Sequence, residues 1–522
     1  MPKFRQPAKL ETLATKQSAV WLCNVGANMI ELIKDMTDAK KASIDSDKVV
    51  EIAHDLFERF VPYYLYKPLS IEVIKGITNL VAKCKETMDF RTDMAKFLGR
   101  IQIAIHLAEA LISTKLRVLD FEETPKMIRT IFYTNLKNMN GLEYLNLGSL
   151  SAGWETMKME YLILDGLQGM NNLQHLSLNY DCTDKILMTL AEHCPKLVSL
   201  DITNSKNIEN KSIDILVDLK HLKVLQLYRT SVTMEGYINI LLHLPELLDV
   251  GRYDQLGRCL EFIDDYHPTY KNFKLANFAS NFATTKQIQI LCECCPNIRA
   301  ISLFHNILLL DLMTLIGLNN LCRLKLLSCD FFADQIKTVL EVKGCNITHL
   351  DLEHVDEIDM NALIYISQFC PDLKSLTMCN CNLIDSTSIS CQRLQVPPFM
   401  NLEHLTLIGD CSIKHIEFIL CNAFRIKFIH FGTQVPTNDG LFEKIFLRNE
   451  LLFLEELRIL HSDFVTIKTA YDLVDNCVNL QKLYELDCWL GIIPGDLDKL
   501  KRYIKEKNYD VDLTSFRNFV TS

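Results

Sequence analysis

Apolar residues recur along most of the chain in the pattern LxxLxL, in which positions one, four and six are hydrophobic. Clear copies begin at Leu142, Leu173, Leu222, Leu321 and Leu402. Copies that use other apolar residues begin at Leu116, Leu197, Ile298, Ile347, Leu373, Ile426 and Leu454, with weaker ones at Leu247, Tyr270 and Leu480. These fifteen copies span 364 residues in fourteen steps, or 26 residues per step. Each copy predicts one short strand that cannot bury its apolar face alone and therefore stacks on its neighbours.

The segments between the strands predict helices. In residues 183–195, Thr183 or Asp184 can cap a helix, and Pro195 ends it because the residue before a proline disfavours helix. The same Cys-Pro ending recurs at Cys295 and Cys370. A strand and a helix repeated every 20–29 residues or so are typical of leucine-rich repeats. We therefore predict an α/β fold, a curved (horseshoe) leucine-rich-repeat solenoid.

The first 115 residues contain no LxxLxL copy and instead predict helices over 19–36, 46–60, 71–84 and 93–112. At the other end, residues 496–507 predict an amphipathic helix that closes the last repeat, where a solenoid needs a polar outer face. The predicted organisation is an all-helical module over 1–112, the solenoid over 113–494, and a capping helix with a tail over 495–522.

The Cys-Pro phrase resembles the cysteine-containing leucine-rich repeats of substrate receptors in cullin-type ubiquitin ligases. The resemblance implies that the N-terminal module docks a ligase. Residues 18–27 are similar to the elongin-binding box of ZYG-type receptors, and residues 61–64 resemble a cullin-2 box. The docking residues would be Trp21, Leu22, Cys23, Val61, Pro62 and Tyr63. An F-box that binds a Skp-type adaptor is the alternative, with residues 67–74 as the nearest segment, and a plain helical cap explains the same pattern.

The repeat register also predicts which side chains a partner would meet. The leucines of LxxLxL point into the core, and the alternate residues point to the concave face. Tyrosine, phenylalanine and arginine are enriched at interfaces because they combine large area with directional bonds. The predicted partner-binding residues are Tyr228, Arg229, Arg252, Tyr253, Phe304, Arg323, Lys325, Asp351 and Glu353. The glycines of residues 250–258 predict a loop that interrupts the repeat.

Composition narrows the function classes. The net charge of 55 − 65 = −10 argues against general nucleic-acid binding, which needs a basic footprint. No run of 18 apolar residues predicts a membrane span, and the first residues carry no apolar signal-peptide core, so we expect a cytoplasmic or nuclear protein with reduced cysteines. The thiols of residues 292–295 lack a second paired cluster for zinc. We expect no catalytic residues, no metal and no cofactor.

These observations favour a protein-recognition role rather than an enzyme. The first interpretation is the substrate-recognition subunit of a cullin-type ubiquitin ligase, with a protein substrate or peptide on the concave face and an elongin–cullin or Skp–cullin adaptor at the N-terminal module. The alternative is a scaffold or signalling adaptor outside any ligase that uses the same concave face.

Overall fold

The computed structural model describes residues 16–20, 51, 54–55, 59, 61–86, 104–121, 124, 126–148, 156–267, 269, 272–304, 310–328, 334–356, 358–381, 383–384 and 399–513. The chain divides into two compact units. The first contains the described residues up to Arg252, and the second contains those from Tyr253 onward. This split falls inside the repeats. The predicted boundaries at 112 and 494 mark changes in the pattern of strands and helices, which the division into compact units does not test. They stay predictions.

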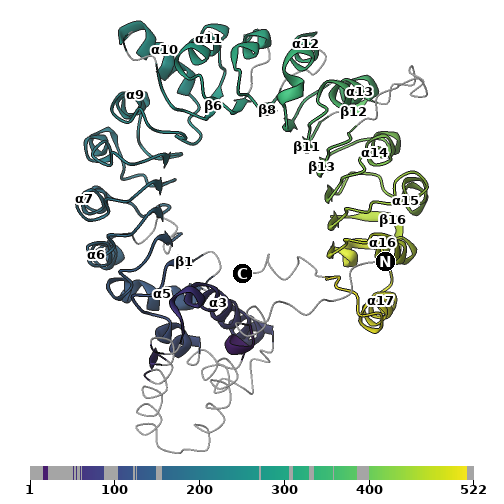
Figure 1. Cartoon of the computed structure of the whole chain (residues 1–522), viewed down its shortest axis with the longest axis horizontal. Helices are drawn as coiled ribbons and strands as arrows, with labels where there is room; N and C mark the ends of the chain where they lie inside the picture. The colour runs from purple at the N-terminus through teal and green to yellow at the C-terminus, as the bar shows by residue number, and fades with distance from the viewer. Residues whose placement is uncertain are drawn as a thin grey trace, which may run out of the picture. The chain divides into compact units, whose positions relative to one another are not determined.

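The first unit contains a parallel sheet whose strand order follows the chain. Its strands are β1 (Val118–Asp120), β2 (Tyr144–Asn146), β3 (His175–Ser177), β4 (Ser199–Asp201) and β5 (Val224–Gln226). They line one side of the unit, and the helices cover the other (Figure 1). These are α5 (Lys126–Thr134), η1 (Leu136–Asn138), α6 (Thr156–Leu167), α7 (Asp184–His193), η2 (Asn210–Ser212), α8 (Ile213–Leu216) and α9 (Met234–His243).

The second unit continues the same architecture with a nine-stranded parallel sheet. Its strands are β6 (Asn277–Asn281), β7 (Ala300–Phe304), β8 (Arg323–Leu327), β9 (His349–Glu353), β11 (Ser375–Cys379), β13 (His404–Ile408), β14 (Phe428–Phe431), β15 (Glu456–Ile459) and β17 (Lys482–Tyr484). Two small sheets pair β10 (Ile358–Asp359) with β12 (Leu383–Ile384) and β16 (Ser462–Thr466) with β18 (Trp489–Gly491).

Helices and short 3-10 turns connect these strands. They are α10 (Leu256–Tyr266), α11 (Thr285–Cys294), η3 (Leu312–Gly317), α12 (Asp334–Lys343), η4 (Gly344–Asn346), α13 (Met360–Phe369), α14 (Ile413–Leu420), α15 (Asp439–Phe446), α16 (Ile467–Asn476), η6 (Leu486–Cys488) and α17 (Pro494–Glu506). Both units are therefore leucine-rich-repeat solenoid, as the sequence pattern predicts.

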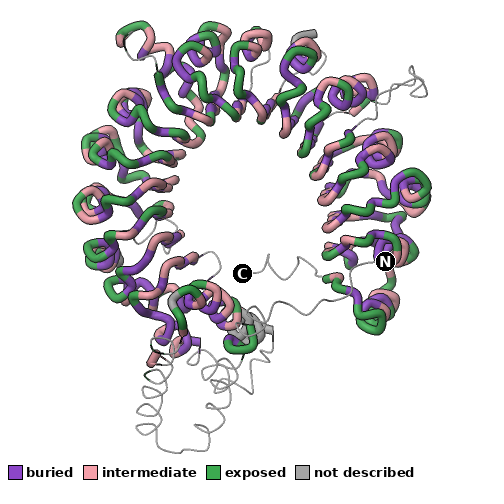
Figure 2. Tube along the Cα trace, in the orientation of Figure 1, coloured by how far each residue is buried: buried purple, intermediate pink, exposed green. Residues whose placement is uncertain are grey.

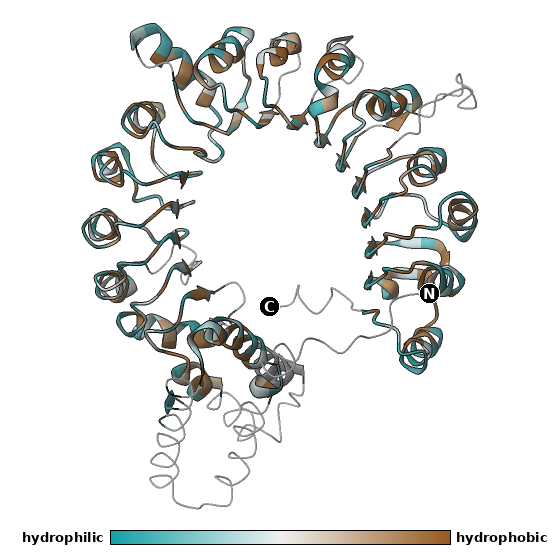
Figure 3. Cartoon of the chain, in the orientation of Figure 1, coloured by the Kyte–Doolittle hydropathy of each residue, from teal (hydrophilic) through white to brown (hydrophobic). Residues whose placement is uncertain are grey.

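The core lies between the strands and the helices. In both units buried positions line this layer (Figure 2), and hydrophobic residues of the helices face the strands (Figure 3). Within β13, Leu405 and Leu407 are 1% and 2% exposed, whereas Thr406 between them is half-buried on the opposite face. Successive strand residues point to opposite faces, so one pattern fixes both the strand and its buried side.

The weak copy at Tyr270 is in the wrong register. Strand β6 begins at Asn277, and its Phe278 is opposite Ile301 of β7. The repeat therefore starts at Leu275, with Phe278 at position four and Ser280 at position six. Ser280 can be buried at a leucine position because its hydroxyl has partners about one repeat earlier in the chain: the amide of Gly257 donates to it at 3.2 Å, and it donates to the carbonyl of Asp254 at 3.3 Å. A polar residue at that site hid the true register.

The three Cys-Pro turns end their helices as predicted. The backbone amides of Cys194, Cys295 and Cys370 donate to helical carbonyls four residues earlier. All three side chains are buried, and they are free thiols. Burial raises the pKa of Cys194 and of Cys370 to about 12, so these thiols are protonated at neutral pH and serve as apolar core groups.

Helix α3 (Tyr63–Glu86) begins eight residues before the predicted helix over 71–84. It buries one apolar face, which comprises Tyr66, Leu69, Val73, Ile74 and Ile77. The Tyr66 hydroxyl donates to the carbonyl of Leu111 at 2.9 Å, which ties α3 to the end of a helix over residues 104–110. At the other end of the chain, α17 forms where the sequence predicts a helix over 496–507, and it buries Leu500 and Ile504.

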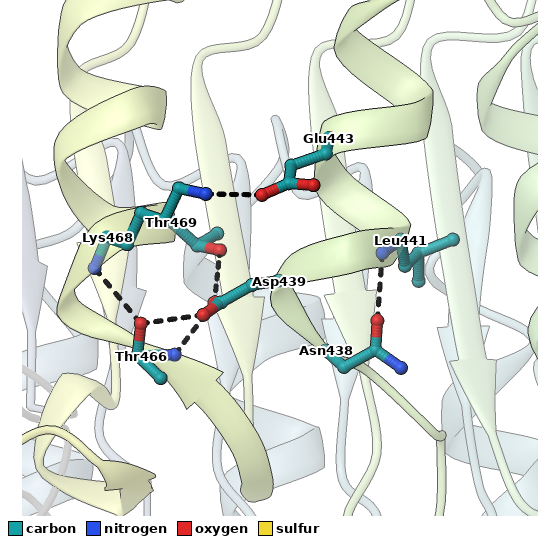
Figure 4. Close-up of polar contacts among 7 residues, drawn as sticks. All are labelled: Asn438, Asp439, Leu441, Glu443, Thr466, Lys468 and Thr469. Atoms are coloured by element: carbon teal, nitrogen blue, oxygen red, sulfur yellow. Dashed lines mark hydrogen bonds and ion pairs between the residues drawn. The ribbon is translucent and has the colours of Figure 1, made fainter.

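Neighbouring repeat helices are joined by hydrogen bonds at their N-terminal ends, as Figure 4 shows for α15 and α16. The Asp439 carboxylate accepts from the Thr466 amide at 2.9 Å, the Thr466 hydroxyl at 2.7 Å and the Thr469 hydroxyl at 2.6 Å. Asn438 caps α15 by accepting from the Leu441 amide at 2.8 Å. An ion pair between Lys468 and Glu443 adds a second link between the same two helices.

Candidate functional site

The candidate site is the concave face of the second unit, defined here as the face of strands β6–β17 turned away from the helices. Parallel pairing brings equivalent positions of successive repeats into rows across the strands. The first row is Asn277, Ala300, Arg323, His349, Ser375, His404, Phe428, Glu456 and Lys482. The second row is Ala279, Ser302, Lys325, Asp351, Thr377, Thr406, His430, Arg458 and Tyr484. All of these side chains are at least partly exposed, so a partner meets two continuous rows.

Four predicted partner-binding residues lie together on β8 and β9. Lys325 is opposite Asp351 in the register, and its ammonium lies 3.1 Å from the Glu353 carboxylate. Arg323 is exposed and opposite His349. Burial and then the Arg323 charge hold the pKa of His349 below its usual value. This part of the concave face therefore presents adjacent basic and acidic groups, as the sequence predicts.

Three more predicted residues meet in the first unit. The guanidinium carbons of Arg229 and Arg252 lie 5.2 and 5.1 Å from the centre of the Tyr228 ring, within the range of cation–π attraction. Arg229 has a φ of 61°, the left-handed conformation, which turns the chain at the end of β5. Gly251 also has a positive φ, and a Cβ there would overlap the side chain of Gln226. A glycine at 251 therefore lets the chain pass close to β5.

Of the two remaining predicted residues, Phe304 differs from expectation and Tyr253 stays a prediction. Phe304 occupies a concave-face position of β7 but is only 7% exposed, so its ring is a buried group rather than a presented one. Tyr253 is the first residue of the second unit, and burial raises its pKa to about 12. The predicted loop over 250–258 extends only to Gln255, because α10 begins at Leu256.

Sequence reasoning missed a cavity of about 260 Å³ on the concave face of β13–β17. We call it the β13–β17 pocket. It is lined by His404, Leu405, Thr406, Phe428, Ile429, His430, Glu456, Arg458 and Tyr484. The alternation rule applied to β13, β14, β15 and β17 would have placed all of these side chains except Leu405 and Ile429 on the concave face. Only the depression that they enclose needed the structure.

Stacking and ion pairs hold the pocket side chains in place. The His404 and Phe428 rings stack with their centres 4.5 Å apart and their planes 12° apart. The Arg458 guanidinium lies 3.3 Å from the carboxylate of Glu485, whose side chain is 6% exposed. Glu456 is paired with Lys482 at 2.5 Å. Burial and then the Arg458 charge lower the pKa of His430, which favours a neutral imidazole at pH 7.

The predicted ligase-docking residues are only partly placed. Trp21, Leu22 and Cys23 lie outside the described residues. Val61 is half-buried and Pro62 is exposed immediately before α3, which begins at Tyr63. The alternative F-box segment over 67–74 lies inside α3, with Pro68 within the helix.

A cavity of about 710 Å³ near residues 109–114 and 135–140 is lined mainly by polar groups, including His54 and Lys137.

One group of potential metal ligands converges among the residues that the structure places: Glu485, Asp487 and Cys488. The charge of Glu485 is already matched by Arg458, and Asp487 is exposed. The predicted thiol cluster at 292–295 brings no such group together. No helix in the described ranges is long and apolar enough to cross a membrane.

No protein-family model matches the chain. Among solved structures, the chain is similar to a leucine-rich-repeat protein of Leptospira interrogans, at 16% identity and a TM-score of 0.36 over 78% of this chain and 91% of that one. For an internalin of Listeria monocytogenes the identity is 17% and the TM-score 0.33, over 57% and 83% of the chains. For a chain of the Rad7 and Elc1 complex in yeast, the identity is 15% and the TM-score is 0.41, over 83% of this chain and 96% of that one.

All three TM-scores lie below 0.5. The assignment of the leucine-rich-repeat fold therefore rests on the 26-residue period and on the in-register parallel strands of this chain.

Proposed function

We propose that this chain is a protein-recognition protein that binds a partner protein on the concave face of its second unit. The observation that carries the proposal is the pair of half-exposed rows across nine strands, which offer aromatic, basic and acidic groups on a rigid sheet. Buried leucines fix the backbone beneath these rows, so the side chains are held in place before a partner arrives. Such preorganisation lowers the entropy cost of binding.

The finer proposal is that the chain is the substrate-recognition subunit of a cullin-type ubiquitin ligase. Its support is the repeated Cys-Pro phrase and the similarity of residues 18–27 and 61–64 to docking boxes. In this role the chain performs no covalent chemistry. It raises the local concentration of a bound substrate near the ubiquitin donor, which makes the transfer effectively intramolecular.

A second candidate function is a scaffold or signalling adaptor without a ligase. The packing of α3 favours it, because a helix that buries its apolar face and ties Tyr66 to Leu111 leaves less of that face to an adaptor. A docking helix would instead leave an apolar face for the adaptor. The two functions use the same concave face and differ only at the N-terminal module.

The test is retention of purified adaptors by the full-length chain. Elongin B/C with cullin-2 and a Skp-type adaptor with its cullin are offered separately to the wild type, to Trp21→Asp/Cys23→Asp and to Arg323→Asp/Lys325→Asp. The ligase function predicts that the docking variant loses the adaptor while the concave-face variant keeps it. Proteins captured from a lysate should be lost by the concave-face variant and kept by the docking variant. Lys501→Asp, which changes an exposed lysine on α17, is the matched control.

Retention of neither adaptor by a folded wild-type chain would reject the ligase function and favour the scaffold. Capture of the same lysate proteins by the wild type and by Arg323→Asp/Lys325→Asp would contradict the concave face as the binding surface.

A further inference from the structure

The turns that lead from each helix into the next strand change character near the end of the second unit. The residue two places before the first apolar position of LxxLxL is proline, cysteine or polar in most repeats: Thr114, Asn140, Asn171, Pro195, Lys220, Pro245, Pro296, Asn319, Cys345 and Pro371. The irregular repeat at Leu275 has the buried Phe273 there. The last four repeats have exposed apolar residues instead: Met400, Phe424, Leu452 and Val478.

These four turns lie side by side. The strands that follow them pair in register, and side-chain hydrogen bonds join one turn to the next. The amide of Asn449 donates to the carbonyl of Ala423 at 3.1 Å, and that of Asn479 donates to the carbonyl of Leu452 at 2.6 Å. The exposed apolar residues therefore form one continuous row along the side of the second unit. We call it the apolar edge, which comprises Met400, Phe424, Leu452, Phe453 and Val478.

The apolar edge is not required by the fold, because the other repeats make the same turn with proline or polar residues. Its five side chains are between 36% and 47% exposed. Together they present roughly 400 Å² of surface, since large apolar side chains have full areas of about 150–250 Å². A contiguous exposed apolar patch of this size commonly marks a surface that binds another molecule.

Charged side chains lie at both ends of the apolar edge and beside its centre. Asp372 is exposed in the turn before Met400. Lys507 lies beyond the opposite end, because the pairing of Lys482 with Asp512 makes the residues after α17 the next layer of the stack. Arg425 is exposed next to Phe424. Among the residues that the structure places, neither Asp372 nor Lys507 nor Arg425 forms an ion pair.

We propose that the apolar edge binds the same edge of a second copy of this chain, in an antiparallel arrangement with two-fold symmetry. Phe424 of one copy then packs on Leu452 of the other. At the ends of the edge, Met400 packs on Val478 of the second copy. The contact lies on the turns and leaves the strand rows of the concave face free, so the inference goes beyond the proposed function and does not depend on it.

Charge complementarity favours the antiparallel arrangement. It brings Asp372 of each copy to the end of the edge where Lys507 of the other copy lies. It also places Arg425 next to Phe453 of the second copy, where a guanidinium can stack on the ring. A parallel arrangement would instead place Asp372 beside Asp372 and Arg425 beside Arg425, and like charges repel.

The size of the edge suits a reversible dimer. A specific interface buries about 800 Å² on each partner, with an apolar centre and a polar rim. The apolar edge supplies about half of that area as the centre, and the neighbouring polar side chains supply the rim. We therefore expect a dissociation constant in the micromolar range. A lipid surface is a poorer match, because membrane-binding surfaces surround their apolar residues with clustered lysine and arginine, whereas this rim carries both signs.

The experiment is sedimentation equilibrium of the full-length chain at concentrations from about 1 to 100 μM. A reducing agent is present because the thiol of Cys345 is exposed and could otherwise cross-link two copies. We expect the wild type to show a monomer–dimer equilibrium, and Phe424→Asp/Leu452→Asp to weaken it at least tenfold. Phe464→Asp, which changes an exposed aromatic residue of β16 outside the apolar edge, is the matched control and should keep the wild-type equilibrium.

Two charge variants test the antiparallel arrangement. Asp372→Lys and Lys507→Asp should each weaken the dimer about threefold or more when measured alone, because each faces a like charge at both ends of the interface. An equimolar mixture of the two should dimerise at least as well as the wild type, since lysine at 372 of one copy then meets aspartate at 507 of the other. Both sites are exposed, so this test remains valid even if Phe424→Asp/Leu452→Asp unfolds. Thermal unfolding of every variant verifies that the solenoid is intact.

A wild-type chain that stays monomeric at the highest concentration would overturn the proposal. A dimer that folded Phe424→Asp/Leu452→Asp retains would overturn it as well, because the interface would then lie elsewhere. A mixture of the charge variants that dimerises no better than either alone would reject the antiparallel arrangement. A monomeric wild type that binds vesicles of phosphatidylcholine and phosphatidylserine, and loses this binding in Phe424→Asp/Leu452→Asp, would assign the edge to a lipid surface instead.

Discussion

The Asp439 carboxylate shows how a single residue holds two repeats together. Burial by itself would raise its pKa, but hydrogen bonds from the Thr466 amide and from the hydroxyls of Thr469 and Thr466 outweigh burial and hold the pKa below 3.8. A folded-state pKa below the unfolded value stabilises the fold above the unfolded pKa, and this stabilisation is lost as the pH falls through the folded-state pKa. The carboxylate therefore supports the α15–α16 contact at neutral pH and not in strong acid.

We predict that Asp439→Asn lowers the free energy of unfolding by about 1.5–3 kcal/mol at pH 7, the usual range for hydrogen bonds to a charged group. The difference from the wild type should persist down to about pH 5 and shrink between about pH 4 and pH 2. Urea unfolding at several pH values measures it. Glu443→Gln, which breaks only an exposed ion pair with Lys468, should change stability by less than about 1 kcal/mol. A difference independent of pH would contradict the role of the charge.

Single residues also show which properties the sequence could predict and which required the structure. Alternation correctly placed Arg323, Lys325, Asp351 and Glu353 together on the concave face. The same rule placed Phe304 on that face but could not show that its ring is covered, because burial depends on groups from other repeats.

At the scale of elements, each repeat is a strand and a helix whose facing sides form the core. The helix start is linked to the preceding helix in several repeats, not only at Asp439. The Thr183 hydroxyl donates to Glu160 at 2.6 Å, and the Ser212 hydroxyl donates to Asp184. The short polar residues at the helix starts thus also connect neighbouring repeats.

Strand β13 provides a direct test of the two faces. Leu405→Ala removes a buried side chain and should cost about 2–5 kcal/mol through lost burial and the cavity left behind. Thr406→Ala, one residue later on the concave face, should change stability by about 0.5 kcal/mol or less. The midpoints of urea unfolding for the two variants and the wild type measure these losses of stability. Similar losses for the two variants would mean that the concave row is part of the core.

At the scale of the whole molecule, the repeat strands form two separate main sheets, one of five and one of nine strands, within two compact units. In solenoids, each repeat is stabilised mainly by its neighbours, so a break in the stack limits cooperativity. The division at 252–253 falls near the glycines at 251 and 257, in the segment that the sequence predicts to interrupt the repeat.

We therefore predict two thermal unfolding transitions for the full-length chain. Leu200→Ala, in β4 of the first unit, should lower the midpoint of one transition by several degrees and leave the other in place. Leu405→Ala should affect the other transition alone. Differential scanning calorimetry of the two variants and the wild type measures this. A single transition that both substitutions shift equally would show that the two units unfold as one.

The sequence by itself determined the repeat, its period and, for most copies, the position of the strand and the face of each strand residue. It could do so because these properties depend on local alternation and on the burial of leucine, which the pattern records directly. It also predicted the helix ends at Cys194, Cys295 and Cys370, since a proline following a helix acts through local sterics.

Only the tertiary structure decided where the register shifts at Leu275, which concave-face residue is covered, and where a pocket forms. Each of these depends on contacts between residues about one repeat apart or more, such as Gly257 with Ser280, His404 with Phe428, and Arg458 with Glu485. A period in the sequence places such residues side by side, but the depth of a surface and the pairing of its charges follow from packing across repeats, which no single repeat encodes.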